Sequence, residues 1–437
     1  MQAQTTQLFR ATIMHTPSNP FTDSSKDAFQ VFEDGGLLVQ NGRIVAVDNF
    51  LKLNQRDIDA QQVDLRPGFL LPGFVDTHVH YPQVYSLGTM GLTLLDWLRQ
   101  RILPDELRFS DRGFAWTAAK DFLTALISHG TTTALVFGVH DFEAQNSLFV
   151  AALELDYRLL SGMITADRNL LEPMHKTPAQ ATIETLKLIE RWHNKGKLRY
   201  ALTPRLAIST SSEMFKALQE LLEARTDLYV QTHLNETLEE VAIVEQLFPH
   251  CRDYLSVYES YGLLRPRAVF AHNIHTNSSQ LQRLAQGCAA VAHCPSSNAF
   301  LGSGLFPLRA HIDHGVKVAI GCDVGAGVSL SLPREGLYAY QMQMLQSDGY
   351  RLSPPQLLYL ITRAGAQALA LEDQIGDFRA GKCADMVLLQ PPPESLLEQQ
   401  LNQNLSPIDK LGVLFTMAEQ NSIAEVYMGG KRVYALK

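Results

Sequence analysis

Short apolar runs recur through the middle of the chain and alternate with longer amphipathic stretches. Eight such runs predict buried strands, at residues 69–76, 131–137, 158–164, 198–204, 228–233, 267–272, 288–293 and 317–323. Helical patterns separate most of them, at residues 114–129, 178–193 and 212–224. Eight strands that alternate with helices predict a (β/α)8 barrel, an α/β fold of the TIM type. The same alternation also allows a doubly wound open sheet.

The two ends of the chain have a different pattern, of short strands around glycine turns. Asn41-Gly42 separates two short strand-like runs near the N-terminus and is a hairpin signal. Gly429-Gly430 lies between two further runs near the C-terminus. We therefore expect residues 1–67 and 375–437 to pack together as one small β-sandwich-like domain. The barrel is expected to take up residues 68–374.

Polar residues lie where the predicted strands end. The strand-end residues that bear on function are His78 and His80 after the first strand, Arg205 after the fourth, and His233, His272 and Asp323 at the fifth, sixth and eighth. A barrel builds its active site from the carboxyl ends of its strands. This placement favours the barrel over the open sheet.

Several of these residues are types that bind metal ions. His78 and His80 are two residues apart and project from the same side of an extended backbone, although two unrelated histidines would leave the same pattern. With His233 and Asp323 they make a set of three imidazoles and one carboxylate, which leaves a position for water as a catalytic metal requires. The fourth predicted strand holds no lysine of the kind that bridges two metals in such barrels, so we expect a single metal.

Two more polar residues have both a catalytic and a structural interpretation. Glu236 follows His233 by three residues, so it can reach water at the metal without binding the ion and can shuttle protons. It could instead be an acid at a helix N-terminus, since Glu239 and Glu240 follow it. His272 is either a buried core histidine or a group that orients the water.

Composition narrows the classes of partner and cofactor. The formal net charge of the 437 residues is −8, from 37 basic and 45 acidic residues without a basic cluster, so a nucleic-acid partner is not expected. The five cysteines form no C-x-x-C pair, which favours a reducing cytoplasm. No run reaches the roughly 18 apolar residues of a membrane span. Gly-rich cradles for nucleotide cofactors are missing too.

A series of motifs along nearly the whole chain resembles the amidohydrolase superfamily and, within it, the guanine deaminases. In order these are PGFVDTHVHYPQ from residue 72, DRN from 167, ERWH from 190, TPR from 203, THLNE from 232, FAH from 270, CPSSN from 294 through LGSGLF to 306, and DVGAG from 323. PGFVDTHVH is shared by many amidohydrolases. HYPQ, TPR and the CPSSN to LGSGLF stretch are the parts that point to guanine.

The resemblance implies hydrolytic deamination of guanine to xanthine and ammonia by a homodimeric enzyme with one zinc ion per chain, iron remaining open. It implies that His78, His80, His233 and Asp323 bind the metal and that Glu236, His272 and Asp323 are catalytic. The residues that it places against guanine are His80, Gln83, Arg205, Leu206, His233, Glu236 and Asp323.

Three of the residues placed against guanine also allow another interpretation. Leu206 stands where members typically carry phenylalanine, which weakens stacking on the purine. Without the resemblance, Gln83 and Arg205 would be read as a surface glutamine and a structural arginine. The alternatives left open are deamination of another purine, a pterin or a triazine, hydrolysis of an amide by a two-metal site, and a non-catalytic barrel.

Overall fold

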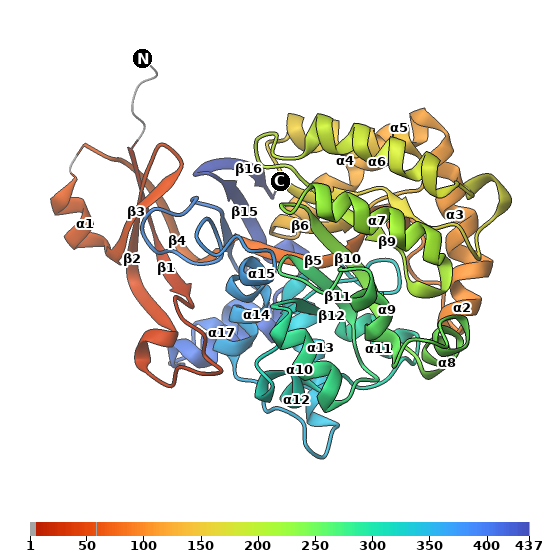
Figure 1. Cartoon of the computed structure of the whole chain (residues 1–437). Helices are drawn as coiled ribbons and strands as arrows, with labels where there is room; N and C mark the ends of the chain where they lie inside the picture. The colour runs from red at the N-terminus through yellow and green to blue at the C-terminus, as the bar shows by residue number, and fades with distance from the viewer. Residues whose placement is uncertain (1–5, 58, 437) are drawn as a thin grey trace.

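A barrel of parallel strands forms the centre of the computed structural model, which describes residues 6–57 and 59–436 (Figure 1). Its strands are β5 (Phe74–His80), β6 (Thr131–Phe137), β7 (Arg158–Gly162), β9 (Arg199–Pro204), β10 (Tyr229–Leu234), β11 (Ala268–His272), β12 (Ala290–His293) and β13 (Lys317–Ile320), while β8 (Ile164–Thr165) pairs beside β9. Each strand pairs with its neighbours in sequence from β5 to β13, without the reversal of order that a doubly wound sheet requires. The predicted barrel is confirmed, and the open sheet is wrong.

The barrel closes where β5 meets the segment that follows β13. The amide of Asp323 donates to the carbonyl of His78 at 2.9 Å, and the amide of His80 donates to the carbonyl of Val324 at 3.0 Å. Gly321 permits this approach, because a Cβ at that position would lie 2.6 Å from the Cβ of His78. The closure therefore brings Asp323 directly beside the two histidines of the first barrel strand.

Helices cover the outside of the barrel and begin at capped positions. The side chain of Asp111 accepts a hydrogen bond from the amide of Phe114, and Thr177 forms a capping box with Gln180. The helices that connect the strands are α4 (Arg112–Ser128), α5 (Phe142–Glu154), α6 (Pro178–Trp192), α7 (Ser212–Ala224), α8 (Leu238–Leu247), α9 (Tyr254–Ser260), α10 (Ser278–Gln286), α11 (Pro295–Phe300) and α12 (Leu308–Asp313). Those that follow the last strand are α13 (Leu332–Met344), α14 (Pro354–Ile361) and α15 (Arg363–Ala368). The three helical patterns in the sequence correspond to α4, α6 and α7.

Two predicted strands, the first and the eighth, have the wrong bounds. Residues 69–72 belong to β4 (Gln61–Pro72) of a second sheet, and the first barrel strand begins only at Phe74. Both segments are buried here, so the apolar run continues across the junction and no polar residue marks the change of sheet. His78 and His80 are consequently the last residues of β5 rather than residues that follow it. Conversely, Asp323 was predicted to end the eighth strand, and it comes three residues after the end of β13.

The second sheet joins strands from both ends of the chain. Its order is β16 (Lys431–Ala435), β15 (Ile423–Met428), β14 (Met386–Leu389), β4, β1 (Thr6–His15), β2 (Gln30–Gln40) and β3 (Arg43–Asn49). The predicted hairpin at Asn41-Gly42 links β2 to β3, with φ of 52° and 78° as a primed turn requires. The helix α1 (Phe50–Arg56) packs on β2 and β3 of this sheet. After β14, α17 (Pro407–Met417) packs against α13 and α14 of the barrel, and α16 (Leu396–Leu401) packs against α17. The first five residues of the predicted N-terminal segment lie outside the described residues.

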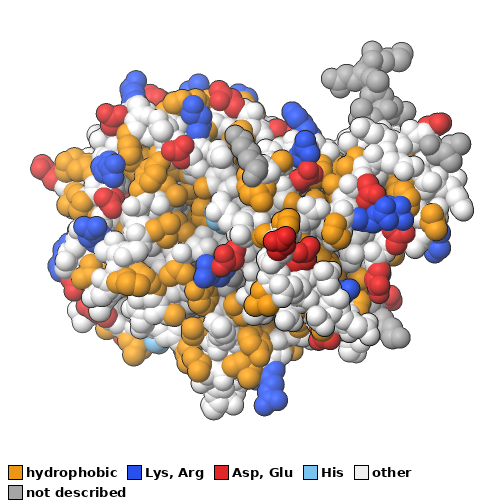
Figure 2. Space-filling model, turned by 180° about the vertical axis from the view of Figure 1, so that it is seen from behind, with side chains coloured by type: hydrophobic (Ala, Val, Ile, Leu, Met, Phe, Trp, Pro, Cys, Tyr) orange, Lys and Arg blue, Asp and Glu red, His pale blue; other side chains and the backbone are white. Residues whose placement is uncertain are grey.

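The surface agrees with the composition of the chain. On the face drawn in Figure 2, Lys and Arg side chains are scattered among Asp and Glu side chains. Hydrophobic side chains are likewise dispersed over this face. In the described part of the chain, every helix is too short or too polar to cross a bilayer.

Candidate active site

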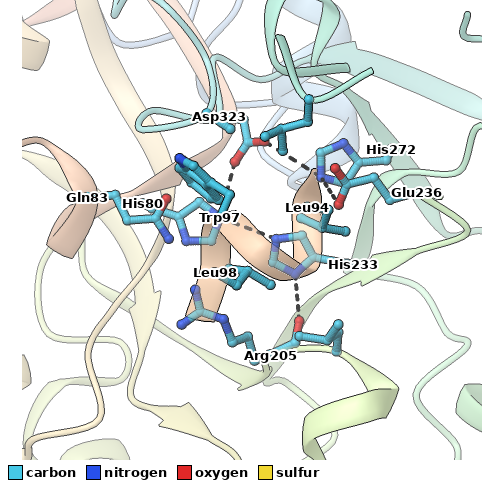
Figure 3. A pocket seen from close by; sticks show the side chains of 13 residues that line it. His80, Gln83, Leu94, Trp97, Leu98, Arg205, His233, Glu236, His272 and Asp323 are labelled. Atoms are coloured by element: carbon cyan, nitrogen blue, oxygen red, sulfur yellow. Dashed lines mark hydrogen bonds and ion pairs between the residues drawn. The ribbon is translucent and has the colours of Figure 1, made fainter. Parts of the chain in front are cut away.

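A cavity lies at the carboxyl ends of the barrel strands and opens towards solvent (Figure 3). Its lining consists of His80, Gln83, Leu94, Trp97, Leu98, Arg205, Leu206, His233, Glu236, His272, Leu301, Asp323 and Ala326. Every predicted site residue except His78 lines this cavity, and the ring of His78 lies 4.9 Å from those of His80 and His233. The structure therefore brings together all the residues that the sequence singled out, from five barrel strands and the turns that follow them.

Three imidazoles and one carboxylate converge at the floor of the cavity. Nε2 of His80 lies 3.2 Å from Nε2 of His78 and 3.3 Å from Nε2 of His233. Oδ1 of Asp323 lies 3.2 Å from the Nε2 atoms of His78 and His80. Four donors that hold one ion tetrahedrally at 2.0–2.1 Å are separated by about 3.3 Å. The observed separations match that spacing.

The chemistry of these donors fits a metal ion as well as their spacing does. The backbone carbonyl of Arg205 lies 2.6 Å from Nδ1 of His233, so Nδ1 donates and the lone pair of Nε2 faces the cluster. Burial lowers the pKa of His80 to about 3 and holds that of His233 well below its usual value, which keeps both imidazoles neutral. Although burial opposes it, the neighbouring His78 keeps the pKa of Asp323 well below its usual range. Converging lone pairs and a carboxylate repel one another unless a cation lies among them.

Glu236 occupies the wall next to this cluster and is buried. Its Oε1 accepts a hydrogen bond from the hydroxyl of Ser303 at 3.0 Å. Burial, followed by the charge of Asp323, raises the pKa of the Glu236 carboxyl to about 8. Glu236 precedes Thr237, the N-cap of α8, and the first-turn acids of that helix are Glu239 and Glu240. Its side chain therefore faces the cavity and is not one of the acids of the helix end.

His272 ends β11 and lies on the same side of the cavity as Glu236 (Figure 3). Its Nδ1 donates to the amide oxygen of Asn298 at 2.9 Å, which directs Nε2 into the site. Nε2 lies 3.5 Å from Glu236 and 3.7 Å from Asp323. His272 and Asp323 both have positive φ, of 70° and 50°, a backbone conformation that non-glycine residues adopt mainly at functional sites and turns.

Gln83 and Arg205 lie on the opposite side of the cavity from Glu236 and His272 (Figure 3). Each is 2% exposed, so the interpretation of Gln83 as a surface glutamine is wrong. Nη1 of Arg205 donates to both carboxylate oxygens of Glu106, at 2.6 and 2.8 Å. Nε2 of Gln83 donates to Oε1 of Glu106 at 3.2 Å, and Oε1 of Gln83 accepts from the amide of Gly325 at 3.2 Å. Leu206, also buried, lines the cavity beside Arg205.

Several residues that shape the site were missed by sequence reasoning. Ser303 and Asn298 lie inside the CPSSN to LGSGLF stretch, so that motif could have identified them. Trp97 and Glu106 lie in a covering segment of α2 (Leu94–Trp97), the π-helical turn η3 (Leu98–Ile102) and α3 (Leu103–Leu107), where no motif was recognised. Trp97 gives the cavity an aromatic side chain that Leu206 does not.

The chain is similar to known proteins over nearly its whole length. The model of the amidohydrolase family matches residues 69–433. A probable guanine deaminase of Deinococcus radiodurans is 46% identical over 98% of this chain and 99% of its own, and guanine deaminase of Escherichia coli is 38% identical over 97% and 95%. The solved structure of the Escherichia coli enzyme superposes with a TM-score of 0.95 at 36% identity and covers 99% of this chain and all of its own.

Proposed function

The chain belongs to the amidohydrolase family and, within it, to the guanine deaminases, and we propose from this premise that the cavity converts guanine and water to xanthine and ammonia. One observation carries the proposal. Gln83 and Arg205, which are suited to a purine edge, lie across the cavity from Glu236 and His272, which are suited to proton transfer. The cluster of three imidazoles and one carboxylate lies between the two pairs. Substrate recognition and hydrolysis can therefore occur on one bound molecule.

Arg205 and Gln83 orient the base. A guanidinium donates to a carbonyl oxygen in a fixed plane, which suits O6 of guanine. The amide of Gln83 has its oxygen and one of its N–H groups held by neighbours, so its second N–H is free for the ring edge. Leu206, Leu98 and Trp97 exclude water around the ring. This arrangement turns C2, which carries the amino group, towards Glu236 and the cluster of three imidazoles and one carboxylate.

Glu236 moves the protons of the reaction. It accepts a proton from the attacking water and delivers it to ring N3, while the oxygen forms its bond to C2. His272 and Asp323 hold the water in place, since Nε2 of His272 and the Asp323 carboxylate both border the position next to Glu236. The new hydroxyl on C2 then gives its proton to Glu236 or Asp323, which passes it to the amino nitrogen. The bond from C2 to that nitrogen breaks, ammonia leaves, and the C2 carbonyl of xanthine remains. The raised pKa of Glu236 suits a group that both takes and returns a proton near neutral pH.

We propose that His78, His80, His233 and Asp323 hold one zinc ion per chain, with iron as the alternative. Nitrogen ligands with one carboxylate are a common zinc environment in catalytic sites. A divalent metal there supplies a Lewis acid that makes water nucleophilic near neutral pH. His80, His233 and Asp323 also border the substrate position, so they would touch the base as well as the metal.

Three further assignments belong to the same proposal. We propose that the enzyme is cytoplasmic, in keeping with its five unpaired cysteines, and that it is a homodimer. Residues 1–67 and 375–437 would form the small composite domain and residues 68–374 the catalytic barrel. The joining of β1 and β14 in one sheet through β4 supports the composite domain, and β4 extends from it to Pro72, past the proposed start of the barrel. Light scattering on the purified protein measures the oligomeric state.

Ammonia release from a substrate panel tests the proposed function. Guanine, adenine, cytosine and a pterin are offered to the purified protein while its metal content is measured by mass spectrometry. Guanine should be the fastest substrate, with about one divalent ion per chain. Faster turnover of adenine, cytosine or the pterin would overturn the substrate assignment, and two tightly bound ions would favour an amide hydrolase.

A further inference from the structure

We propose that Glu106, a residue with no motif around it, is a positioning residue that orients Arg205 and Gln83 for the carbonyl edge of the purine. The inference rests on the proposed function, because the purine is the ligand that these two side chains would recognise. Glu106 does not line the cavity. It would act through the two residues that do.

The geometry of the triad fixes which donors remain for a ligand. Both carboxylate oxygens of Glu106 accept hydrogen bonds from Nη1 of Arg205, and Oε1 also accepts one from Nε2 of Gln83. Within the described residues, Nη1 is the Arg205 nitrogen with hydrogen-bond partners, which leaves Nε and Nη2 for a ligand. By fixing both side chains, Glu106 would hold their remaining donors for the same edge of a bound ring.

The pair also makes it possible to bury a cation beside a metal site. The side chains of Arg205 and Glu106 are 2% and 1% exposed. An arginine cannot lose its proton, so an unpaired guanidinium at this depth would be strongly destabilising. His140 lies 3.7 Å from Glu106 but does not compete as a cation, because burial and the charge of Arg205 keep its pKa well below its usual value. The charge of Glu106 is thus matched by Arg205.

Glu106 further joins the cover of the site to the barrel wall. It lies on α3, in the covering segment that places Leu94, Trp97 and Leu98 over the cavity. Arg205 follows β9, and Gln83 follows β5 in the turn η2 (Tyr81–Gln83). One carboxylate therefore connects three separate parts of the chain, and the two residues that it holds, Gln83 and Arg205, line the cavity (Figure 3).

The test uses two ligands that differ at the carbonyl and cannot be deaminated. Hypoxanthine carries the O6 carbonyl, purine lacks it, and neither has an amino group at C2. Calorimetry measures both dissociation constants for the metal-loaded wild type, Glu106→Gln and Asp105→Asn. Asp105 is the matched control, since it is on the same helix but accepts from the hydroxyl of Ser86 instead of Arg205.

Glu106→Gln should weaken hypoxanthine binding by about 10-fold or more, because the new amide presents N–H donors to two donors and removes the counter-charge. In the same variant, the dissociation constant of purine should change by less than about threefold. In Asp105→Asn, the dissociation constants of both hypoxanthine and purine should change by less than about threefold. The KM for guanine should rise as hypoxanthine binding weakens, with a smaller change in kcat. An unchanged hypoxanthine constant, or an equal loss for both ligands, would overturn the inference.

A double-variant cycle keeps the test decisive if Glu106→Gln alone does not fold. Arg205→Gln and Glu106→Gln with Arg205→Gln leave no unpaired guanidinium, and removing both partners of a buried pair is tolerated better than removing one. If Glu106 acts through Arg205, its substitution should add less than about threefold to the loss of hypoxanthine binding in the Arg205→Gln background. A full further loss there would show a role independent of Arg205. Binding is read without turnover, so a wild type that does not deaminate guanine contradicts only the proposed function.

Discussion

Replacement of Glu236 by glutamine should separate chemistry from stability more clearly than any other change in the site. Glutamine has nearly the same shape and can still accept the hydrogen bond from Ser303, which is 3.0 Å away. It cannot carry a proton between water and the ring. Turnover should fall by about 10²- to 10⁴-fold, which corresponds to about 3–5 kcal/mol of activation free energy.

The same change should raise the stability of the metal-stripped protein at neutral pH. The pKa of Glu236 is raised to about 8 in the folded chain, from an ordinary value of 4.5. The folded state therefore holds a proton that the unfolded state releases above pH 4.5, so this carboxyl makes folding less favourable as the pH rises from 4.5 to 8. At pH 7.5 the difference amounts to at most about 4 kcal/mol, and glutamine removes it.

Urea unfolding of chelator-treated proteins at pH 5 and pH 7.5, with ammonia release from the metal-loaded enzymes, measures both effects. Glu239→Gln is the control, because Glu239 is an exposed acid in the first turn of α8. It should keep full turnover and lose at most about 1 kcal/mol through the helix dipole. Wild-type turnover in Glu236→Gln, together with lower stability at pH 7.5, would refute the proton-transfer role and favour a purely structural one.

Three further predictions address the metal, the substrate and acid stability. His233→Ala should lose the metal and the activity together, because three ligands remain; one divalent ion per wild-type chain by mass spectrometry is expected, and full activity without metal would contradict this. Arg205→Ala should shrink the ratio of guanine to adenine turnover by about 10²-fold or more, with poor rescue by lysine; an unchanged ratio would reject the O6 contact. Burial lowers the pKa of His15 to about 4, so its folded form stays neutral and stability should fall as the pH drops from 6.5 towards 4. Asparagine in His15→Asn can still accept the hydrogen bond from the amide of Phe378. This variant should reduce the loss in the free energy of unfolding between pH 6.5 and 4 by up to about 3 kcal/mol, as measured by urea unfolding, and an identical loss would exclude His15 as its source.

The barrel could be predicted because parallel strands covered by helices are buried on both faces and leave continuous apolar runs. β6 illustrates this, since all seven of its residues are buried and its predicted bounds agree with the structure. The same property caused the error at β4 and β5, where Gly73 separates two buried strands of different sheets without any change in polarity. Hydrophobicity reports burial, and it does not report the sheet to which a buried strand belongs.

The metal and proton-transfer residues were predictable for a related reason. A histidine or an acid stands out in the sequence when it comes at the end of an apolar run that predicts a buried strand. His233 and Asp323 were recognised in that way. Glu106 carries no such signal. It lies in the short helix LPDEL beside Asp105, where acids are ordinary first-turn residues, and its partner Arg205 is 99 residues away. Only the folded chain brings these two charges together.

The carboxylates of Asp323 and Glu236 have different roles because their neighbours differ. Asp323 and Glu236 are both buried, and burial alone would raise the pKa of each. The imidazoles of His78 and His80 surround Asp323 and keep its pKa low, so it remains a charged ligand. Glu236 has a single hydroxyl donor and faces the charge of Asp323, which moves its pKa to about 8. Groups whose pKa values are pushed apart in one cavity take different roles: Asp323 is charged before the reaction begins, and Glu236 carries the proton of the attacking water to the ring. The ionisation of Asp323 thus helps to make Glu236 the residue that exchanges protons with the substrate.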